Sequence, residues 1–266
     1  MQSNELKGMK VLVTRPAHQN QKLCDLVRAH GGEPVVFPLI NIEPTYAHEA
    51  LLTVLTRIDD IDIAIFVSAN AVTHGLGALR AQGQTLSELT QVFAVGATTA
   101  RMLQAAGIRV DGVPRVLSGA NGLRALPSFR NVSNRRIVVF RGNGGEPSLL
   151  EWLKKEGARV FVAETYRRAM PIQVNPAVIE LCQQATIDVI TLTSITSVKH
   201  LFALLPDTTH RMLKNATVVT LSQRIARYCE NIGWQGSILV ADEASDQALV
   251  KTIVQYGDTV RQSSRS

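Results

Sequence analysis

Short runs of aliphatic and β-branched residues alternate with segments of helical periodicity along the whole chain. The first run, Lys10 to Thr14, precedes a segment at 17–30 in which Leu23, Leu26 and Val27 form one apolar face that Gly31 and Gly32 close. The same criteria predict strands at 34–37, 61–67, 92–95 and 109–113, and helices at 47–57, from about 70, at 98–106 and from near Ser118. Strands and helices in strict alternation are typical of an α/β protein whose parallel sheet is covered on both faces.

The second half of the chain repeats the first at one fixed offset. Four pairs of landmarks are each separated by 126 residues: Arg15 and Arg141, Ser68 and Ser194, Gly96 and Ser222, Gly31 and Gly157. A shared offset predicts a tandem internal repeat with copies at about 9–135 and 136–261. Each copy supplies about five strands, the size of a flavodoxin-like doubly wound sheet. A chance alignment of two ordinary α/β patterns is the alternative.

Composition narrows the choice of partner. The 266 residues, 45% of them hydrophobic, are enough for about two domains. A net charge of +6 favours an acidic partner, but it does not separate nucleic acid from an anionic metabolite. Aromatic residues make up 5% of the chain, and no Lys/Arg run is interleaved with them, so we expect no nucleic-acid partner.

Cysteines and hydropathy indicate a cytoplasmic protein. Cys24, Cys182 and Cys229 are too few and too scattered for a disulfide framework or a zinc site, and we expect buried, reduced thiols. No apolar run approaches the roughly 18 residues of a membrane span, so we expect no membrane partner. The polar leader has no secretory hydrophobic segment. We expect residues 1–8 and 258–266 to be disordered.

Six turns that follow predicted strands are rich in glycine and small hydroxyl residues. In doubly wound sheets, ligands bind at these turns, where helix N-termini present free backbone N–H groups to anions. Simple N-capping selects the same residue types and is the alternative for any single turn. Turns from two facing domains would together suit a ligand that carries several carboxylates. The candidate binding residues are Arg15, Ser68, Asn70, Gly96, Thr98, Thr99, Arg141, Gly142, Asn143, Thr193, Ser194, Thr196, Ser222 and Gln223.

Several common cofactor and catalytic motifs are missing. No Gly-x-Gly-x-x-Gly follows a strand, and the turn Arg141-Gly142-Asn143-Gly144-Gly145 lacks the Lys-Ser/Thr of a phosphate-binding loop. The six histidines show no metal-ligand spacing, and no Gly-x-Ser-x-Gly elbow is present. We therefore predict neither a cofactor nor a metal.

Tyr166 is the candidate catalytic residue. Its repeat partner, 126 residues earlier, is Ile40. The segments 38–44 and 164–171 are both extended and both reach a proline, which predicts a pair of linker strands between two domains. A tyrosine present in one copy only is a candidate for function, although an aromatic that packs and hydrogen-bonds is an equal alternative. A phenol is a weak acid suited to protonating a leaving hydroxyl.

Four motifs, taken together, resemble uroporphyrinogen-III synthases over residues 9–257. They are Val11-Leu12-Val13-Thr14-Arg15-Pro16, Val67-Ser68-Ala69-Asn70-Ala71-Val72, Val95-Gly96-Ala97-Thr98-Thr99-Ala100 and Thr165-Tyr166-Arg167-Arg168. The resemblance implies two flavodoxin-like domains joined by a two-stranded linker, with the active site in the cleft between them. One domain would comprise 9–38 plus 172–257 and the other 43–165, so that each domain mixes pieces of both repeats.

The resemblance also implies the activity. The family cyclises hydroxymethylbilane, a linear tetrapyrrole with eight carboxylates, to uroporphyrinogen III by inverting ring D through a spiro intermediate, with loss of water and no cofactor. Tyr166 matches the tyrosine proposed to assist departure of the hydroxyl, and Ser68, Thr99 and Ser194 match hydroxyl residues of the family site. The family also implies a monomer.

The turn Leu221-Ser222-Gln223-Arg224-Ile225 departs from the Gly-Pro-Thr-like turn of many relatives, although Ser222 and Gln223 could replace the missing threonine.

A non-catalytic, two-domain protein that binds a small anionic ligand, like a periplasmic binding protein, is the alternative function. Such proteins usually present aromatic stacking platforms, in which this chain is poor. The catalytic interpretation requires the phenol of Tyr166 to face a gap rather than packed interior.

Overall fold

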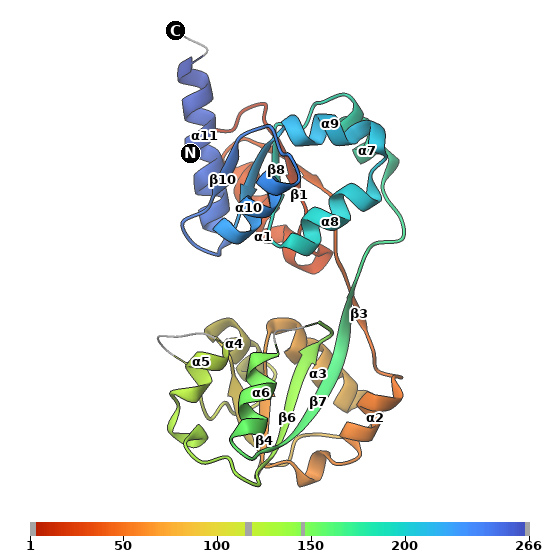
Figure 1. Cartoon of the computed structure of the whole chain (residues 1–266), viewed down its shortest axis with the longest axis vertical. Coiled ribbons are helices and arrows are strands. Elements are labelled where there is room, and N and C mark those ends of the chain that lie inside the picture. Colours follow the sequence, from red (N-terminus) through yellow and green to blue (C-terminus); the bar gives the residue numbers. More distant parts are fainter. Residues whose placement is uncertain (1–3, 115–118, 145–146, 264–266) are drawn as a thin grey trace. The chain divides into compact units, whose positions relative to one another are not determined.

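The computed structural model describes residues 4–114, 119–144 and 147–263. The chain divides into two compact units (Figure 1), one formed by Met1–Asn41 with Ala169–Ser266 and the other by Ile42–Arg168. Each unit is built on one five-stranded sheet with helices on both faces. The prediction of an α/β protein with parallel sheets is confirmed. The start of the helix expected near Ser118 lies outside the described residues, within which α5 runs from Gly119 to Arg124.

The first unit has the strand order β10-β9-β8-β1-β2, with every neighbouring pair parallel. Its two hydrophobic cores lie on opposite faces of the sheet: α1 and α11 contribute to one, and α7 to α10 contribute to the other. The strands are β1 (Lys10–Val13), β2 (Glu33–Val36), β8 (Val189–Leu192), β9 (Thr217–Thr220) and β10 (Ile238–Val240). The helices are α1 (Ala17–Ala29), α7 (Pro176–Gln183), α8 (Ile195–Leu204), α9 (Asp207–Asn215), α10 (Gln223–Asn231) and α11 (Asp246–Ser263).

Both ends of the first unit are more ordered than the sequence predicts. Leu6 is fully buried in the core beneath α1 and α11, and its backbone N–H bonds the carbonyl of His30 at 2.8 Å. At the other end, α11 continues to Ser263. The expectation of disorder at 1–8 and 258–266 is therefore wrong for 4–8 and 258–263, while 1–3 and 264–266 lie outside the described residues. Leu6 alone, in an otherwise polar segment, was too weak a pattern to predict that the leader packs against the core.

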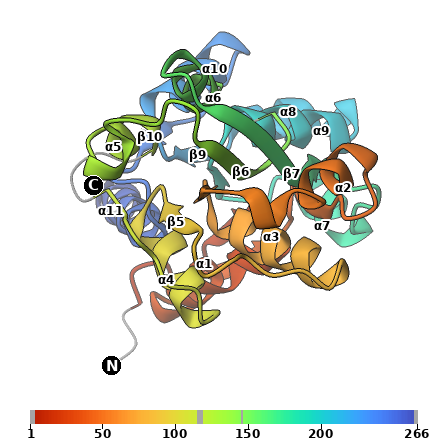
Figure 2. The ribbon, with the colours of Figure 1, turned by 90° about the horizontal axis from the view of Figure 1, so that it is seen from below.

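The second unit has the strand order β3-β7-β6-β4-β5. Figure 2 shows α5 and α6 on one side of the sheet and α3 and α4 on the other, and the two cores follow this division. The strands are β3 (Asn41–Pro44), β4 (Ile63–Phe66), β5 (Gln91–Ala94), β6 (Arg136–Gly142) and β7 (Arg159–Ala169). The helices are α2 (Glu49–Leu55), α3 (Ala69–Ala81), α4 (Ala97–Ala105), α5 and α6 (Ser148–Lys155), with short 3-10 helices at Ile58–Asp60 and Pro127–Phe129.

The strand predicted at 109–113 is reduced to one isolated bridge. Gly112 pairs with Phe93 of β5, and the Asp111 carboxylate accepts the N–H of Val92 at 2.8 Å. A glycine lacks the side chain that packs a strand, and Pro114 removes a donor two residues later. The segment lies along the edge of the sheet without extending the ladder.

Two aspartates fasten the central strand pairs at their N-terminal ends. In the second unit, Asp62 precedes β4 and accepts the backbone N–H of Arg136 at 2.7 Å; in the first, Asp188 accepts that of Lys10 at 2.7 Å. Burial acts to raise the pKa of Asp62, but the hydrogen bonds from Arg136 and the charges of Arg135 and Arg136 outweigh it, so the pKa lies below its ordinary value.

We expect Asp62→Ala to destabilise the second unit by about 1.5–3 kcal/mol, because a charge-assisted hydrogen bond is lost. Since the pKa of Asp62 is lowered by folding, its contribution is present above the ordinary value of 3.8 and disappears as the pH falls through the folded-state pKa. Urea unfolding monitored by Trp152, the only tryptophan of this unit, in a Trp234→Phe background measures the effect.

The exposed neighbour Asp59 provides the matched control, and Asp59→Ala should change stability by less than about 0.5 kcal/mol. Equal effects of the two substitutions at pH 7, or an Asp62→Ala deficit that persists unchanged below the pKa, would contradict the assignment.

Candidate functional site

The predicted site residues lie at the carboxyl ends of the parallel strands within each unit. In the second unit they follow β4 and β5, lie at the end of β6 or just after it, or lie near the end of β7. In the first unit they follow β1, β8 and β9. The second-unit set is Ser68, Asn70, Gly96, Thr98, Thr99, Arg141, Gly142, Asn143 and Tyr166. The first-unit set is Arg15, Thr193, Ser194, Thr196, Ser222 and Gln223.

A β-bulge near the end of β7 determines where Tyr166 points. Phe140 pairs with Ala163 and Arg141 with Glu164, but Gly142 pairs with Tyr166, so β7 carries one extra residue. Without the bulge, Ala163 and Tyr166 would face opposite sides of the sheet because side chains alternate. With it, both belong to the core that α3 covers. The bulge thus directs the phenol toward the start of α3.

The side chain of Tyr166 is almost completely covered, with 1% of its surface exposed. Its hydroxyl lies 3.1 Å from Oγ of Ser68, and the imidazole of His74 packs on its ring with centroids 5.5 Å apart. Gly142 backs the same ring so closely that a Cβ there would lie 2.3 Å from Cε2 of Tyr166. Within the second unit, the expectation that the phenol faces an open gap is wrong, so a catalytic role for Tyr166 requires a neighbouring group that carries its proton to the substrate. Its hydroxyl nevertheless lies at the carboxyl edge of the sheet, beside a half-buried serine.

N-capping accounts for part of the hydroxyl pattern. Ser68 caps α3 by accepting the N–H of Ala71, and Ser194 caps α8 by accepting that of Ser197, each at 3.0 Å. Gly96 and Ser222 hold the equivalent positions before α4 and α10 without a side-chain cap bond. The alternative of simple capping therefore applies to two of these four positions.

The turn after β6 braces the end of β7. Asn143 donates its backbone N–H to the carbonyl of Tyr166 at 3.1 Å, and its Oδ1 accepts the N–H of Arg168 at 2.8 Å. Arg141 is 7% exposed, and its Nε donates to the carbonyl of Gly142. Gly145, the last residue of the predicted turn, lies outside the described residues. These hydrogen bonds hold the end of β7 in place, whether or not the turn also binds a ligand.

The other candidates differ in exposure. Thr99 is buried, with 5% of its surface exposed, so its hydroxyl is poorly placed to reach a ligand. Asn70, Thr193 and Ser222 are half-buried, whereas Thr98, Thr196 and Gln223 are exposed. Thr98 also accepts a hydrogen bond from Arg101 of the same helix at 3.2 Å.

Arg15 is paired with an acidic residue that the sequence did not single out. Its Nε lies 2.9 Å from Oδ1 of Asp246, the first residue of α11, and 18% and 11% of the two side chains are exposed. The carboxylate compensates the guanidinium charge and ties the end of β1 to the last helix. A substrate carboxylate at Arg15 would have to compete with Asp246.

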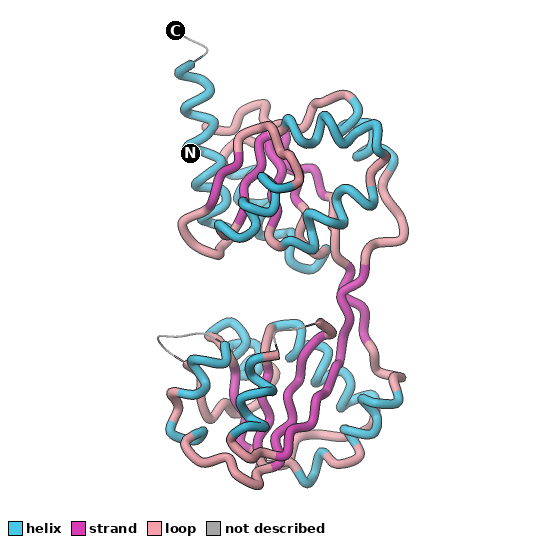
Figure 3. Tube along the Cα trace, in the orientation of Figure 1, coloured by secondary structure: helices cyan, strands magenta, loops and turns pink. Residues whose placement is uncertain are grey.

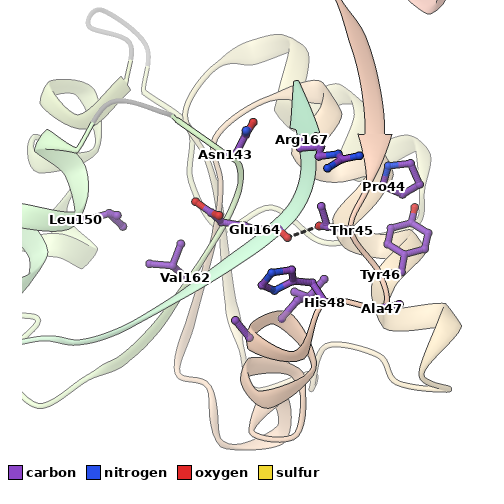
Figure 4. Close-up of a pocket in the computed structure, with 12 residues that line it drawn as sticks. Pro44, Thr45, Tyr46, Ala47, His48, Asn143, Leu150, Val162, Glu164 and Arg167 are labelled. Atoms are coloured by element: carbon purple, nitrogen blue, oxygen red, sulfur yellow. Dashed lines mark hydrogen bonds between the residues drawn. The ribbon is translucent and has the colours of Figure 1, made fainter. Parts of the chain in front are cut away.

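A cavity of about 890 Å³ lies elsewhere in the second unit. Figure 4 shows Val162 and Glu164 of β7 beside it, with Leu150 of α6 on one side and His48, just before α2, on the other. Thr45 donates its hydroxyl to the carbonyl of Glu164 (Figure 4). Asn143 is the one predicted site residue that lines it, so its volume alone does not identify the predicted site.

Among the described residues, no group of three or more His, Cys, Asp and Glu side chains is arranged to hold a metal ion. No helix in the described ranges is both long enough and apolar enough to cross a membrane. All three cysteines are free and buried, and burial raises the pKa of Cys182 and Cys229 to about 11.

These features define an α/β protein that presents hydroxyl and amide groups at the carboxyl ends of two parallel sheets. The family model described as "Uroporphyrinogen-III synthase HemD" matches residues 21–251. The chain belongs to the uroporphyrinogen-III synthase family.

Individual relatives agree with the family. The chain is 29% identical over 247 residues to uroporphyrinogen-III synthase of Escherichia coli strain K12 and 28% identical over 247 residues to that of Salmonella typhimurium strain LT2; each match covers 92% of this chain and 100% of the relative. Solved structures of uroporphyrinogen-III synthases from Thermus thermophilus and Helicobacter pylori share the fold, with TM-scores of 0.58 and 0.59 at 17% and 15% identity. The aligned regions cover 96% of this chain for the Thermus thermophilus structure and 93% for the Helicobacter pylori structure, and 99% of each of those chains.

The predicted function, a uroporphyrinogen-III synthase, is therefore confirmed over the alternative of a non-catalytic binding protein. The roles of individual residues rest on the geometry described above.

We expect Arg15→Met and Asp246→Asn each to destabilise the first unit by about 1–3 kcal/mol, because each leaves one partly buried polar group without its partner. The double variant should lose less than the sum of the two, as residues in direct contact are coupled. Urea unfolding monitored by Trp234, the only tryptophan of this unit, measures all three.

Lys251 and Asp242, an exposed pair at 3.1 Å, provide the control, and removing either should cost less than about 1 kcal/mol. Strictly additive losses at Arg15 and Asp246 would show that the pair does not anchor α11.

Proposed function

We propose that this chain cyclises hydroxymethylbilane to uroporphyrinogen III, with inversion of ring D and loss of water. Family membership carries the proposal. The site chemistry supports it, because helix N-termini with small hydroxyl residues suit the carboxylates of a polyanionic tetrapyrrole. The net charge of +6 favours the same substrate.

We also propose that the two units are flavodoxin-like domains produced by a tandem repeat. The first unit has the order β2-β1-β8-β9-β10, the flavodoxin order 2-1-3-4-5. In the second unit, β6 takes the place of strand 1, so that β7-β6-β4-β5 corresponds to 2-1-3-4. The Gly112 bridge beside β5 lies where strand 5 would be. Domains of this kind would each combine strands from both repeats.

Residues 126 apart support the repeat by their local geometry. Gly31 and Gly157, which follow α1 and α6, both have φ of +81°. Asp62 and Asp188 form the same hydrogen bond, and their donors, Arg136 and Lys10, are also 126 residues apart. Each aspartate thus bonds a strand of the other repeat, as expected if the copies exchanged strands between the two domains.

The proposed linker comprises 38–44 and 164–171, in agreement with the division at Asn41 and Arg168. Figure 3 shows β3 and β7 side by side, and they are neighbours in the sheet. The backbone N–H of Thr45 bonds the carbonyl of Thr165 at 3.2 Å, and Arg167 pairs with Glu43 at 2.8 Å.

We also propose a cytoplasmic location. Three buried free thiols support a reducing compartment such as the cytoplasm.

The proposed mechanism depends mainly on positioning. Backbone amides and hydroxyls at the strand ends would hold the carboxylates so that ring D closes in the inverted sense. Tyr166 would assist departure of the hydroxyl group by supplying a proton, so that it leaves as water. No cofactor is required by this scheme.

Incubation of the protein with enzymatically generated hydroxymethylbilane tests the activity. We expect predominantly the type III isomer after oxidation and chromatographic separation, whereas the substrate alone gives type I. Formation of type I only, with a protein shown to be folded by circular dichroism, would overturn the proposed function.

We expect Tyr166→Phe to lower kcat by about 10²-fold or more with little change in KM, the effect of losing a general acid. Tyr256→Phe is the matched control, because it removes a phenol that accepts a hydrogen bond from Thr217 in the first unit at 2.8 Å. Equal activity of Tyr166→Phe and wild type would remove the catalytic assignment but leave the fold unaffected.

A further inference from the structure

The enclosure of Tyr166 raises the question of how its proton reaches a substrate. The side chain is 1% exposed, while Ser68, 3.1 Å from its hydroxyl, is half-buried at the N-terminus of α3. Ser68 therefore lies between the phenol and the solvent-accessible edge of the sheet. A general acid must come within hydrogen-bond reach of the group it protonates, or act through one intermediary.

The hydrogen bonds of Ser68 suit an intermediary. A hydroxyl has one donor and two acceptor positions, and the N–H of Ala71 occupies one acceptor at 3.0 Å. If Tyr166 donates to the second, the proton of Ser68 itself is available to an external oxygen. The cap bond meanwhile fixes the position of Oγ relative to the phenol.

Two further residues fix the phenol against this serine. Gly142 leaves space for the ring on one side, since a Cβ would lie 2.3 Å from Cε2 and 2.5 Å from Cζ. The imidazole of His74 packs against the ring from α3. Gly142 does not have a positive φ, so this position requires glycine for space and not for backbone conformation.

We propose that Ser68 is the residue that meets the departing hydroxyl group and that Tyr166 acts through it, with Gly142 and His74 as positioning residues. The inference rests on the proposed function. In this step, the C–O bond of the hydroxymethyl group breaks, and the Ser68 proton converts the leaving hydroxide to water. Tyr166 then reprotonates Ser68 and becomes a phenolate. The proton released when the closing pyrrole regains aromaticity restores the phenol.

A double-mutant cycle at Ser68 and Tyr166 tests the relay. If the two hydroxyls act as one unit, Ser68→Ala, Tyr166→Phe and the double variant should all lower kcat by the same factor, about 10²-fold, with KM changed less than about threefold. Ser68→Thr keeps both the hydroxyl and the cap, and it should retain activity within about fivefold of wild type. If Ser68 only binds a carboxylate or caps α3, Ser68→Ala should lower kcat much less, and the two losses should multiply; either result would overturn the relay.

Asn175→Ala is the matched control for the lost cap. Asn175 caps α7 by accepting the N–H of Ala177 at 3.0 Å and lies outside the proposed site. Its substitution should lower stability by about 1 kcal/mol without changing kcat. A comparable loss of kcat in this variant would show that cap loss alone explains the effect of Ser68→Ala.

Gly142→Ala tests the positioning role from the other side of the ring. The added methyl group should displace the phenol and lower kcat by about the same factor as Tyr166→Phe, while adding no further loss in a Tyr166→Phe background. Full activity of folded Gly142→Ala would contradict the positioning role. A wild type that makes only type I would defeat the proposed function, whereas type III formation with multiplicative losses would defeat the relay alone.

Discussion

The β-bulge between β6 and β7 is the constraint on which the candidate site depends. One extra residue in β7 opposes Arg141 and Gly142, and it brings Tyr166 to the same face as Ala163. In a regular strand of this length the phenol would point away from α3 and from Ser68. Bulges are commonly used to redirect a side chain next to an active site. Here the bulge connects the phenol to a helix cap.

The bulge requires support from the turn that follows β6. Gly142 provides the space that the ring occupies, and Asn143 bonds the backbone of β7 on both sides of Arg167, at Tyr166 and Arg168. The end of β6 and Asn143 are therefore coupled to the end of β7 by packing and hydrogen bonds. A site whose main task is to orient a flexible substrate needs rigid supporting residues. The same turn can supply both support and binding groups.

The sequence was sufficient to predict most of the regular elements, the segment 109–113 being an exception, and the position of the site residues on them. Apolar runs and helix caps located the strands and helices, and strand ends located the hydroxyl-rich turns, because parallel strands bring those turns to one edge. The bulge was not predictable, because no local residue pattern marks it. A one-residue shift in register places the side chain of Tyr166 on the opposite face of the sheet. The burial of Leu6 and the ion pair between Arg15 and Asp246 depend on contacts between distant parts of the chain. Periodicity carries no information on such contacts.

The placement of Tyr166 can be measured without an activity assay, by NMR of protein labelled at Cζ of its four tyrosines. Tyr166→Phe identifies the signal of Tyr166. We expect Ser68→Ala and Gly142→Ala each to shift this signal more than those of Tyr228 and Tyr256, because Ser68→Ala removes the hydrogen-bond partner of Tyr166 and Gly142→Ala displaces its ring. A Tyr166 signal that is unchanged in both variants would contradict the central claim that the bulge holds this phenol between Gly142 and Ser68.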